Sequence, residues 1–152
     1  MIQRIQTIFL ALAALCGFSL FLEPMDFALV PSAQGGDSLS PMLADGVFDI
    51  QDNTGLVALA VFIGLVPLIG IFLFKNRKLQ MTIDRLAMVG SIVLLGFGGY
   101  LFYQAFEPVQ DKIQAVAGFG LAAPILSLVF LMLANRFIKK DEKLVRSADR
   151  LR

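Results

Sequence analysis

The chain has 152 residues, of which 57% are hydrophobic and 16% are charged. Soluble domains carry about 25% charged residues. This composition, with a mean hydropathy of +0.77, therefore excludes an ordinary soluble protein and indicates an integral membrane protein. The net charge of +1 favours no class of partner by itself. Because Cys16 is the single cysteine and histidine is absent, neither an intrachain disulfide nor a Cys/His zinc site is expected.

Four uncharged stretches follow one another along the chain, over residues 5–22, 54–74, 86–106 and 113–135. They are 18, 21, 21 and 23 residues long, and a hydrocarbon core of about 30 Å needs about 20 apolar residues in a helix. The sequence therefore predicts an all-α membrane protein, a single domain over residues 1–152 in which four transmembrane helices form an antiparallel bundle. The alternative for the first stretch is a cleaved signal peptide. Its length and the lack of a prompt A-x-A site favour a retained anchor.

Small residues four positions apart predict where helices approach each other closely. The pairs are Ala13 with Gly17, Ala60 with Gly64, and Gly118 with Ala122. Pro67 and Pro124 lie near the middle of the second and fourth stretches. We interpret both as tolerated kinks rather than as broken helices around a substrate site, because no polar or charged residue neighbours either proline.

Residues 23–53 form the one long connection. Two short apolar patches, DFALV and GVFDI, flank a centre rich in Ser, Gly and Pro, which predicts a small β-hairpin in this loop. Four acids, Asp37, Asp45, Asp49 and Asp52, offer oxygen ligands for a cation. The D-x-D-x-D-G order of a calcium loop is missing, however. We interpret these residues as solvated acids and expect neither a metal nor a cofactor.

Basic residues gather in two places, the connection after the second stretch and the tail of residues 136–152. They are Lys75, Arg77, Lys78, Arg85, Arg136, Lys139, Lys140, Lys143, Arg146, Arg150 and Arg152. With Arg4 they make 12 of the 13 basic residues, whereas the other two connections hold eight of the 12 acids. Cytoplasmic loops retain Lys and Arg, so both termini and the loop KNRKLQMTIDR are predicted to face the cytoplasm.

The tail also has a helical pattern, because Phe137, Ile138, Leu144 and Val145 recur at helical spacing while basic residues occupy other faces. The fourth helix is therefore predicted to extend into the cytoplasm. Three interpretations stay open for this extension. It can dock a cytoplasmic protein partner, lie against anionic lipids, or pack on the protein's own cytoplasmic loop.

The four stretches contain no Asp, Glu, Lys, Arg or His. Coupled transporters place such a residue near the bilayer midplane, and catalysis needs an acid, a base, a nucleophile or a metal ligand. The sequence therefore predicts no enzyme and no catalytic residue. It also argues against an ion-coupled transporter.

Three segments carry a family resemblance: MIQRIQT at residues 1–7, KNRKLQ at residues 75–80 and VRSADRLR at residues 145–152. They resemble the ends and the central loop of domain of unknown function 4293 (DUF4293), a family of four-helix inner-membrane proteins of Bacteroidota. The resemblance covers the full chain and implies a multi-pass protein of the bacterial inner membrane. It brings no activity, substrate or catalytic residue.

Two function classes follow from these observations. The first is a non-enzymatic accessory or scaffold protein whose basic residues form a cytoplasmic platform for a protein partner or anionic lipid. The second is a small transport or channel module, which would have to form a homo-oligomer because four short helices enclose little volume. Nucleic-acid binding is not expected, since the basic tail lacks exposed aromatic residues for base stacking and carries acids.

Overall fold

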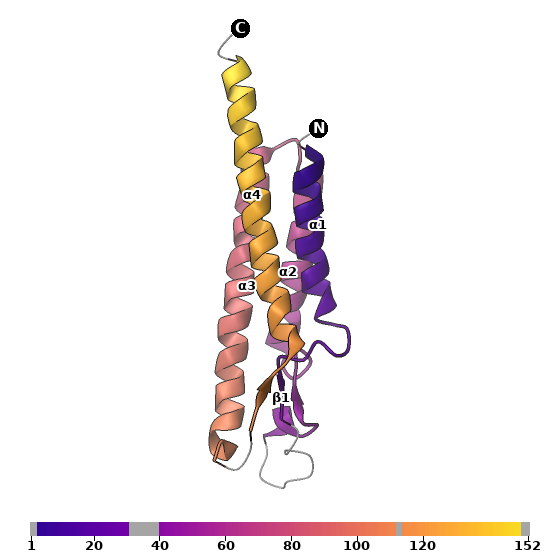
Figure 1. Ribbon diagram of the computed structural model, residues 1–152, viewed down its shortest axis with the longest axis vertical. Helices are drawn as coiled ribbons and strands as arrows, with labels where there is room; N and C mark the ends of the chain where they lie inside the picture. Colours follow the sequence, from indigo (N-terminus) through magenta and orange to yellow (C-terminus); the bar gives the residue numbers. More distant parts are fainter. Residues whose placement is uncertain (1–2, 31–39, 112–113, 150–152) are drawn as a thin grey trace.

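The computed structural model describes residues 3–30, 40–111 and 114–149. Within these residues the chain forms four α-helices: α1 (Gln3–Ser19), α2 (Thr54–Phe72), α3 (Arg77–Phe106) and α4 (Ala122–Asp149). Three short 3-10 helices lie in the connections between them: η2 (Pro41–Leu43), η3 (Glu107–Val109) and η4 (Phe119–Leu121). The helices run along the long axis of the molecule (Figure 1).

α1 packs mainly against α2 and α4, and α3 also packs mainly against α2 and α4, while α2 and α4 touch each other only slightly. The start of α1, the turn of residues 73–76 and the end of α4 lie at one end of the molecule (Figure 1). We call this the basic end, and residues 136–149 the α4 extension. A small β-sheet lies at the opposite end, which we call the sheet end.

Three helical regions are long and apolar enough to cross a membrane, namely Thr54–Phe72, Arg77–Val109 and Phe119–Val145. Their outer faces carry large exposed apolar side chains, among them Ile69, Val89 and Met132, as expected of helices that face lipid. The remaining predicted span, residues 5–22, differs from these three. Its helix α1 ends at Ser19, and the apolar part of that helix, Ile5–Ser19, is shorter than the usual span of about 20 residues.

The third helix begins nine residues earlier than predicted, at Arg77 instead of residue 86. Asn76 caps it, since its side-chain oxygen accepts a hydrogen bond from the Leu79 backbone N–H at 3.2 Å. Residues 77–85, which include Arg77, Lys78 and Arg85, were predicted to belong to a loop. They are helical because their inward face, Gln80, Met81 and Asp84, is buried against the other helices.

The fourth helix begins at Ala122, nine residues later than predicted, because residues 114–121 bond to the first connection instead. The backbone N–H of Gly118 donates to the Phe27 carbonyl at 2.9 Å, and that of Gly120 donates to the Asp26 carbonyl at 2.8 Å. Pro124 therefore lies in the first turn of α4, where a missing N–H costs little. The kink predicted at Pro124 is wrong, whereas Pro67 does lie inside α2.

The sheet has three short strands, β1 (Ala28–Leu29), β2 (Val47–Phe48) and β3 (Val116–Ala117), in the order β2-β1-β3. Both pairings are antiparallel, with Ala28 opposite Phe48 on one side and Ala117 on the other. The DFALV and GVFDI patches supply the first pair, and β3 is an addition that the sequence did not predict. Beneath the sheet, the Phe48 ring packs on Phe102 of α3 with ring centroids 5.5 Å apart.

Candidate functional site

The predicted basic residues lie at the basic end, but not all on a loop. Lys75 is in the α2–α3 turn, Lys78 and Arg85 are exposed on α3, and four more are exposed on the α4 extension: Arg136, Lys139, Lys140 and Lys143. Arg146 lies in α4, and Arg150 and Arg152 lie outside the described residues. Most of these charges therefore stand on two helices that pack against each other.

A groove of about 560 Å³ separates the α2–α3 turn from the α4 extension. Lys75, Arg77 and Lys78 line one side of it, and Glu142 and Val145 line the other. The structure thus brings three of the predicted residues together at one groove. Arg85, Arg136 and the three lysines of the α4 extension do not line it.

The first turns of the α4 extension are held by the protein itself. Arg77 forms an ion pair with Asp141 at 2.8 Å, with side chains 22% and 13% exposed. Phe137 stacks on Phe9 of α1 with ring centroids 5.5 Å apart, and Ile138 is buried. The interpretation that the tail packs on the segment KNRKLQMTIDR fits the ion pair of Asp141 with Arg77, whereas the contact of Phe137 with Phe9 of α1 was not predicted. Farther along, Leu144 and Val145 are exposed.

A buried carboxylate lies inside the helices, where the sequence predicted no charge. Asp84 is 0% exposed and belongs to α3, within the apolar region Arg77–Val109. The sequence did not predict a buried charge at Asp84, because the expected helix began at residue 86, two residues after it. Among the residues that the structure describes, no group hydrogen-bonds to either of its carboxylate oxygens. Burial of such a group without a partner is costly, so Asp84 is a candidate functional residue.

Two buried amide side chains lie at the same depth in the helices as Asp84. Leu10, Ala87 and Leu131 belong to one apolar cluster, and Gln6, Asp84 and Asn135 each lie one helical turn from them toward the basic end. Like Asp84, Gln6 and Asn135 are at least nine-tenths buried. Within the described chain, the Gln6 Nε2 and both polar atoms of the Asn135 amide have no hydrogen-bond partner. We call Gln6, Asp84 and Asn135 the polar layer.

α2 contributes a glycine at this depth. A Cβ at Gly70 would lie 2.9 Å from Asp84 Oδ1 and 3.7 Å from Leu10 Cδ1, so only a glycine leaves this space to the carboxylate. The Gly70 carbonyl accepts a hydrogen bond from Gln80 Nε2 at 3.0 Å. Gln80 in turn lines a pocket of about 520 Å³ that is also lined by Gln6 and Arg77. Of the polar layer, Gln6 lines this pocket, whereas Asp84 and Asn135 do not.

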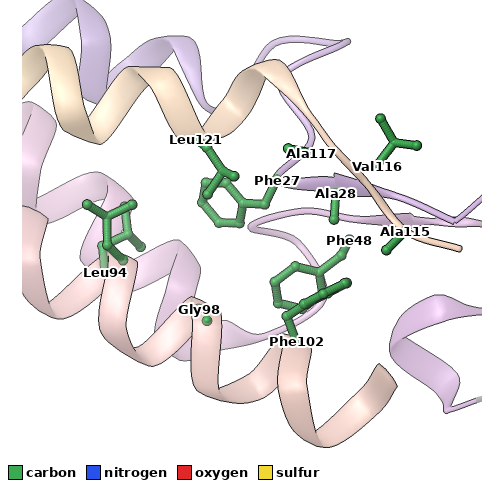
Figure 2. A pocket seen from close by; sticks show the side chains of 12 residues that line it. Phe27, Ala28, Phe48, Leu94, Gly98, Phe102, Ala115, Val116, Ala117 and Leu121 are labelled. Atoms are coloured by element: carbon green, nitrogen blue, oxygen red, sulfur yellow. The ribbon is translucent and has the colours of Figure 1, made fainter. Parts of the chain in front are cut away.

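A second pocket, of about 280 Å³, lies between the sheet and α3 at the sheet end. Figure 2 shows the rings of Phe27, Phe48 and Phe102 around it, with Leu94 and Leu121 on one side. Its lining side chains are apolar, so it suits an apolar group. The sequence did not predict this pocket, because part of its wall is β3.

Three of the four acids considered as cation ligands, Asp45, Asp49 and Asp52, accept hydrogen bonds from nearby backbone N–H groups in turns, and Asp37 lies outside the described residues. Asp52 Oδ2 accepts from the Asp49 backbone N–H at 2.8 Å, and Asp49 Oδ1 accepts from that of Gln51 at 2.6 Å. Burial raises the pKa of Asp52 to about 6, and the neighbouring charges of Asp49 and Asp45 add to this rise. Within the described part of the chain, no three His, Cys, Asp or Glu side chains gather as a metal site would require.

Comparison with known proteins identifies a family but no activity. The family model described as "Domain of unknown function (DUF4293)" matches residues 2–151, nearly the whole chain. No curated protein and no solved structure matches significantly. The match extends over all four helices, the sheet and the basic end, and it agrees with the terminal and central segments that carried the resemblance. The chain therefore belongs to the DUF4293 family.

Proposed function

We propose that this protein is a non-enzymatic accessory or scaffold protein of the bacterial inner membrane whose basic end docks a cytoplasmic protein. The observation that carries the proposal is the groove of Lys75, Arg77 and Lys78 against the α4 extension. The proposal includes both termini in the cytoplasm, because Lys and Arg are retained on that side.

All four helices cross the membrane in this proposal. The 17 residues of α1 span about 26 Å at 1.5 Å per residue, slightly less than a hydrocarbon core of about 30 Å. Local thinning of the bilayer and flanking polar side chains can compensate for such a mismatch. The packing of α1 on both α2 and α4 supports the crossing, since it places α1 at the same depth as helices that are long enough to span.

Two exposed apolar residues of the α4 extension favour a protein partner over lipid. Leu144 and Val145 are 49% and 45% exposed, next to the exposed Lys143. An apolar strip flanked by basic side chains fits a groove with an apolar floor and acidic rim, the usual way in which a helix is bound by another protein. A helix lying on a lipid surface would bury such apolar residues among the headgroups, but the extension continues α4 along the long axis of the molecule (Figure 1).

The topology can be tested with single cysteines after Cys16→Ala removes the native thiol. Asp45→Cys at the sheet end is expected to react with a membrane-impermeant thiol reagent in cells whose outer membrane is opened. Lys139→Cys and Gln3→Cys are expected to react only after the inner membrane is opened as well. Labelling of Gln3→Cys with Asp45→Cys would show that α1 does not cross.

The docking proposal can be tested by crosslinking in native membranes with variants that spare the Arg77–Asp141 ion pair. A chain ending at Lys143 and the double variant Leu144→Asp, Val145→Asp are both expected to lose the co-purified partner. Lys139→Gln, on a part of the extension held by the protein itself, serves as the matched control and is expected to retain it. If every form brings down the same proteins, the extension has no docking role.

A second candidate function, a small oligomeric transport or channel module, is favoured by one observation. Asp84 places an ionisable group inside the helices, where it is fully buried. Ionisable residues inside membrane proteins typically mark ion or substrate sites. A flux assay on reconstituted vesicles tests this candidate, with Asp84→Asn expected to abolish any flux.

A further inference from the structure

We infer that the polar layer of Gln6, Asp84 and Asn135 binds one monovalent cation that enters from the basic end. This inference does not depend on the docking of a protein partner. It rests on three side chains from three helices, all buried and all with polar atoms that lack partners among the described residues. The occupant is either a proton or an alkali ion, whose shared chemistry is a single positive charge at a carboxylate.

The charge of the layer determines the class of ligand. Asp84 is its one ionisable group, and a buried carboxylate is stable only when it is neutralised or paired. One positive charge balances it, whereas a divalent ion would leave an uncompensated charge. The two Asp84 oxygens and Asn135 Oδ1 are oxygen ligands of the kind that alkali ions accept. The amide N–H groups of Gln6 and Asn135 remain as donors, which can hydrogen-bond to water bound with the ion.

The neighbouring charges do not neutralise Asp84. Gly70 of α2 lies beside the Asp84 carboxylate, with Leu10 of α1 close by. At the same depth the helices carry Gln6 on α1 and Leu131 and Asn135 on α4, and all of these residues are uncharged. Arg77 lines the pocket but is paired with Asp141 at 2.8 Å. The adjacent Arg85 and Arg136 are exposed. A cation from outside is therefore the partner that fits the carboxylate.

The basic end is the side from which the layer is approached. Of its three side chains, Gln6 lines the pocket that Gln80 and Arg77 also line, and Gln80 Nε2 donates a hydrogen bond to the Gly70 carbonyl beside Asp84. Toward the sheet end, the next layer is Leu10, Ala87 and Leu131, which are fully buried. The cation is therefore expected to enter from the basic end, past Gln6.

The experiment measures the thermal unfolding of the purified full chain in detergent. Sodium or potassium chloride is exchanged for choline chloride at constant ionic strength, and each series is repeated from pH 5.5 to 8.5. An alkali-ion site gives a saturable rise in Tm with sodium or potassium at high pH. A proton site gives a rise in Tm as the pH falls in choline, with no alkali effect. Both outcomes support the inference and distinguish the two occupants.

Variants keep the test specific. Asp84→Asn removes the charge, keeps the shape and is expected to abolish the response, whereas Asp45→Asn, an exposed acid at the sheet end, is expected to retain it. Asn135→Leu is expected to raise the half-saturating cation concentration about tenfold, the equivalent of one lost polar ligand. Asp52 contributes a pH dependence of its own, so the difference between the unchanged chain and Asp84→Asn is the quantity compared. A response that is absent, or that persists in Asp84→Asn, overturns the inference.

Discussion

Gly17→Ala is expected to destabilise the contact between α1 and α2. A Cβ at Gly17 would lie 2.6 Å from the Gly64 backbone nitrogen, 2.7 Å from the Gly64 Cα and 2.9 Å from the Ile63 carbonyl carbon. Ordinary contacts of a Cβ begin at 3.4 Å, so the helices would have to separate by the difference. Because a Cβ is fixed to the backbone and its neighbours here are backbone atoms, no side-chain rotation relieves the clash.

The expected magnitude follows from two opposing effects. Overpacking of an interior typically costs about 1–3 kcal/mol, and replacing glycine by alanine inside a helix returns up to about 1 kcal/mol. The net loss is about 1–2 kcal/mol of unfolding free energy. Gly96→Ala on α3 is the matched control, because a Cβ there meets nothing within 4 Å. It is expected to leave stability unchanged or raise it slightly.

The assay is reversible unfolding in mixed micelles, in which the fraction of denaturing detergent is raised and helicity is followed. A lower midpoint for Gly17→Ala, with none for Gly96→Ala, is the expected result. Equal midpoints for the two variants would show that α1 and α2 do not approach each other as described. The reasoning from small-residue spacing, which paired Ala13 with Gly17 and Ala60 with Gly64, would then fail for this pair of helices.

Three further predictions concern the two ends of the molecule. The pKa of Asp52 is raised from 3.8 to about 6, so its stabilising contribution is complete below about pH 4 and is lost as the pH rises through 6. Asp52→Asn is therefore expected to stabilise the protein at pH 7 by about 1 kcal/mol after solvent screening, with no gain at pH 4 in thermal unfolding. Arg77→Gln leaves Asp141 without its ion-pair partner and is expected to cost about 1–2 kcal/mol. It should also speed hydrogen exchange in the α4 extension, and unchanged exchange would contradict the pairing. Gly118→Ala places a Cβ against the Asp26 carbonyl oxygen and is expected to lower stability by about 2–3 kcal/mol, whereas Gly99→Ala, with nothing within 4 Å, should not.

Hydropathy predicted the helices where one apolar stretch makes one helix. α2 was expected over residues 54–74 and extends over Thr54–Phe72. The prediction failed at the start of α3. Arg77, Lys78 and Arg85 lower the average hydropathy there, although Gln80 and Asp84 of the same segment are buried. The prediction failed again at the start of α4, because the bond between Gly118 and Phe27 joins residues far apart in the chain. A local average of hydropathy contains neither kind of information.

The site was predictable to a similar extent. Counting Lys and Arg in each connection predicted that the basic residues gather at one end of the molecule. This count needs only the positions of the residues along the chain. The ion pair between Arg77 and Asp141 depends on the packing of α3 against α4, which no local pattern shows. Asp84 was treated as a loop acid for the same reason. Its importance lies in its close approach to Gly70 of α2 and in the depth that it shares with the buried Gln6 of α1 and Asn135 of α4.

The order of the strands has a consequence for how the protein is made. β1 pairs with β2, which precedes α2, and with β3, which follows α3. A ribosome delivers β1 and β2 early, but Val116 emerges only after α2 and α3 have been synthesised. Until then β1 keeps one unpaired edge, open to proteases and chaperones. The pairing of β3 covers that edge, so the sheet can be completed only after α3 has been synthesised.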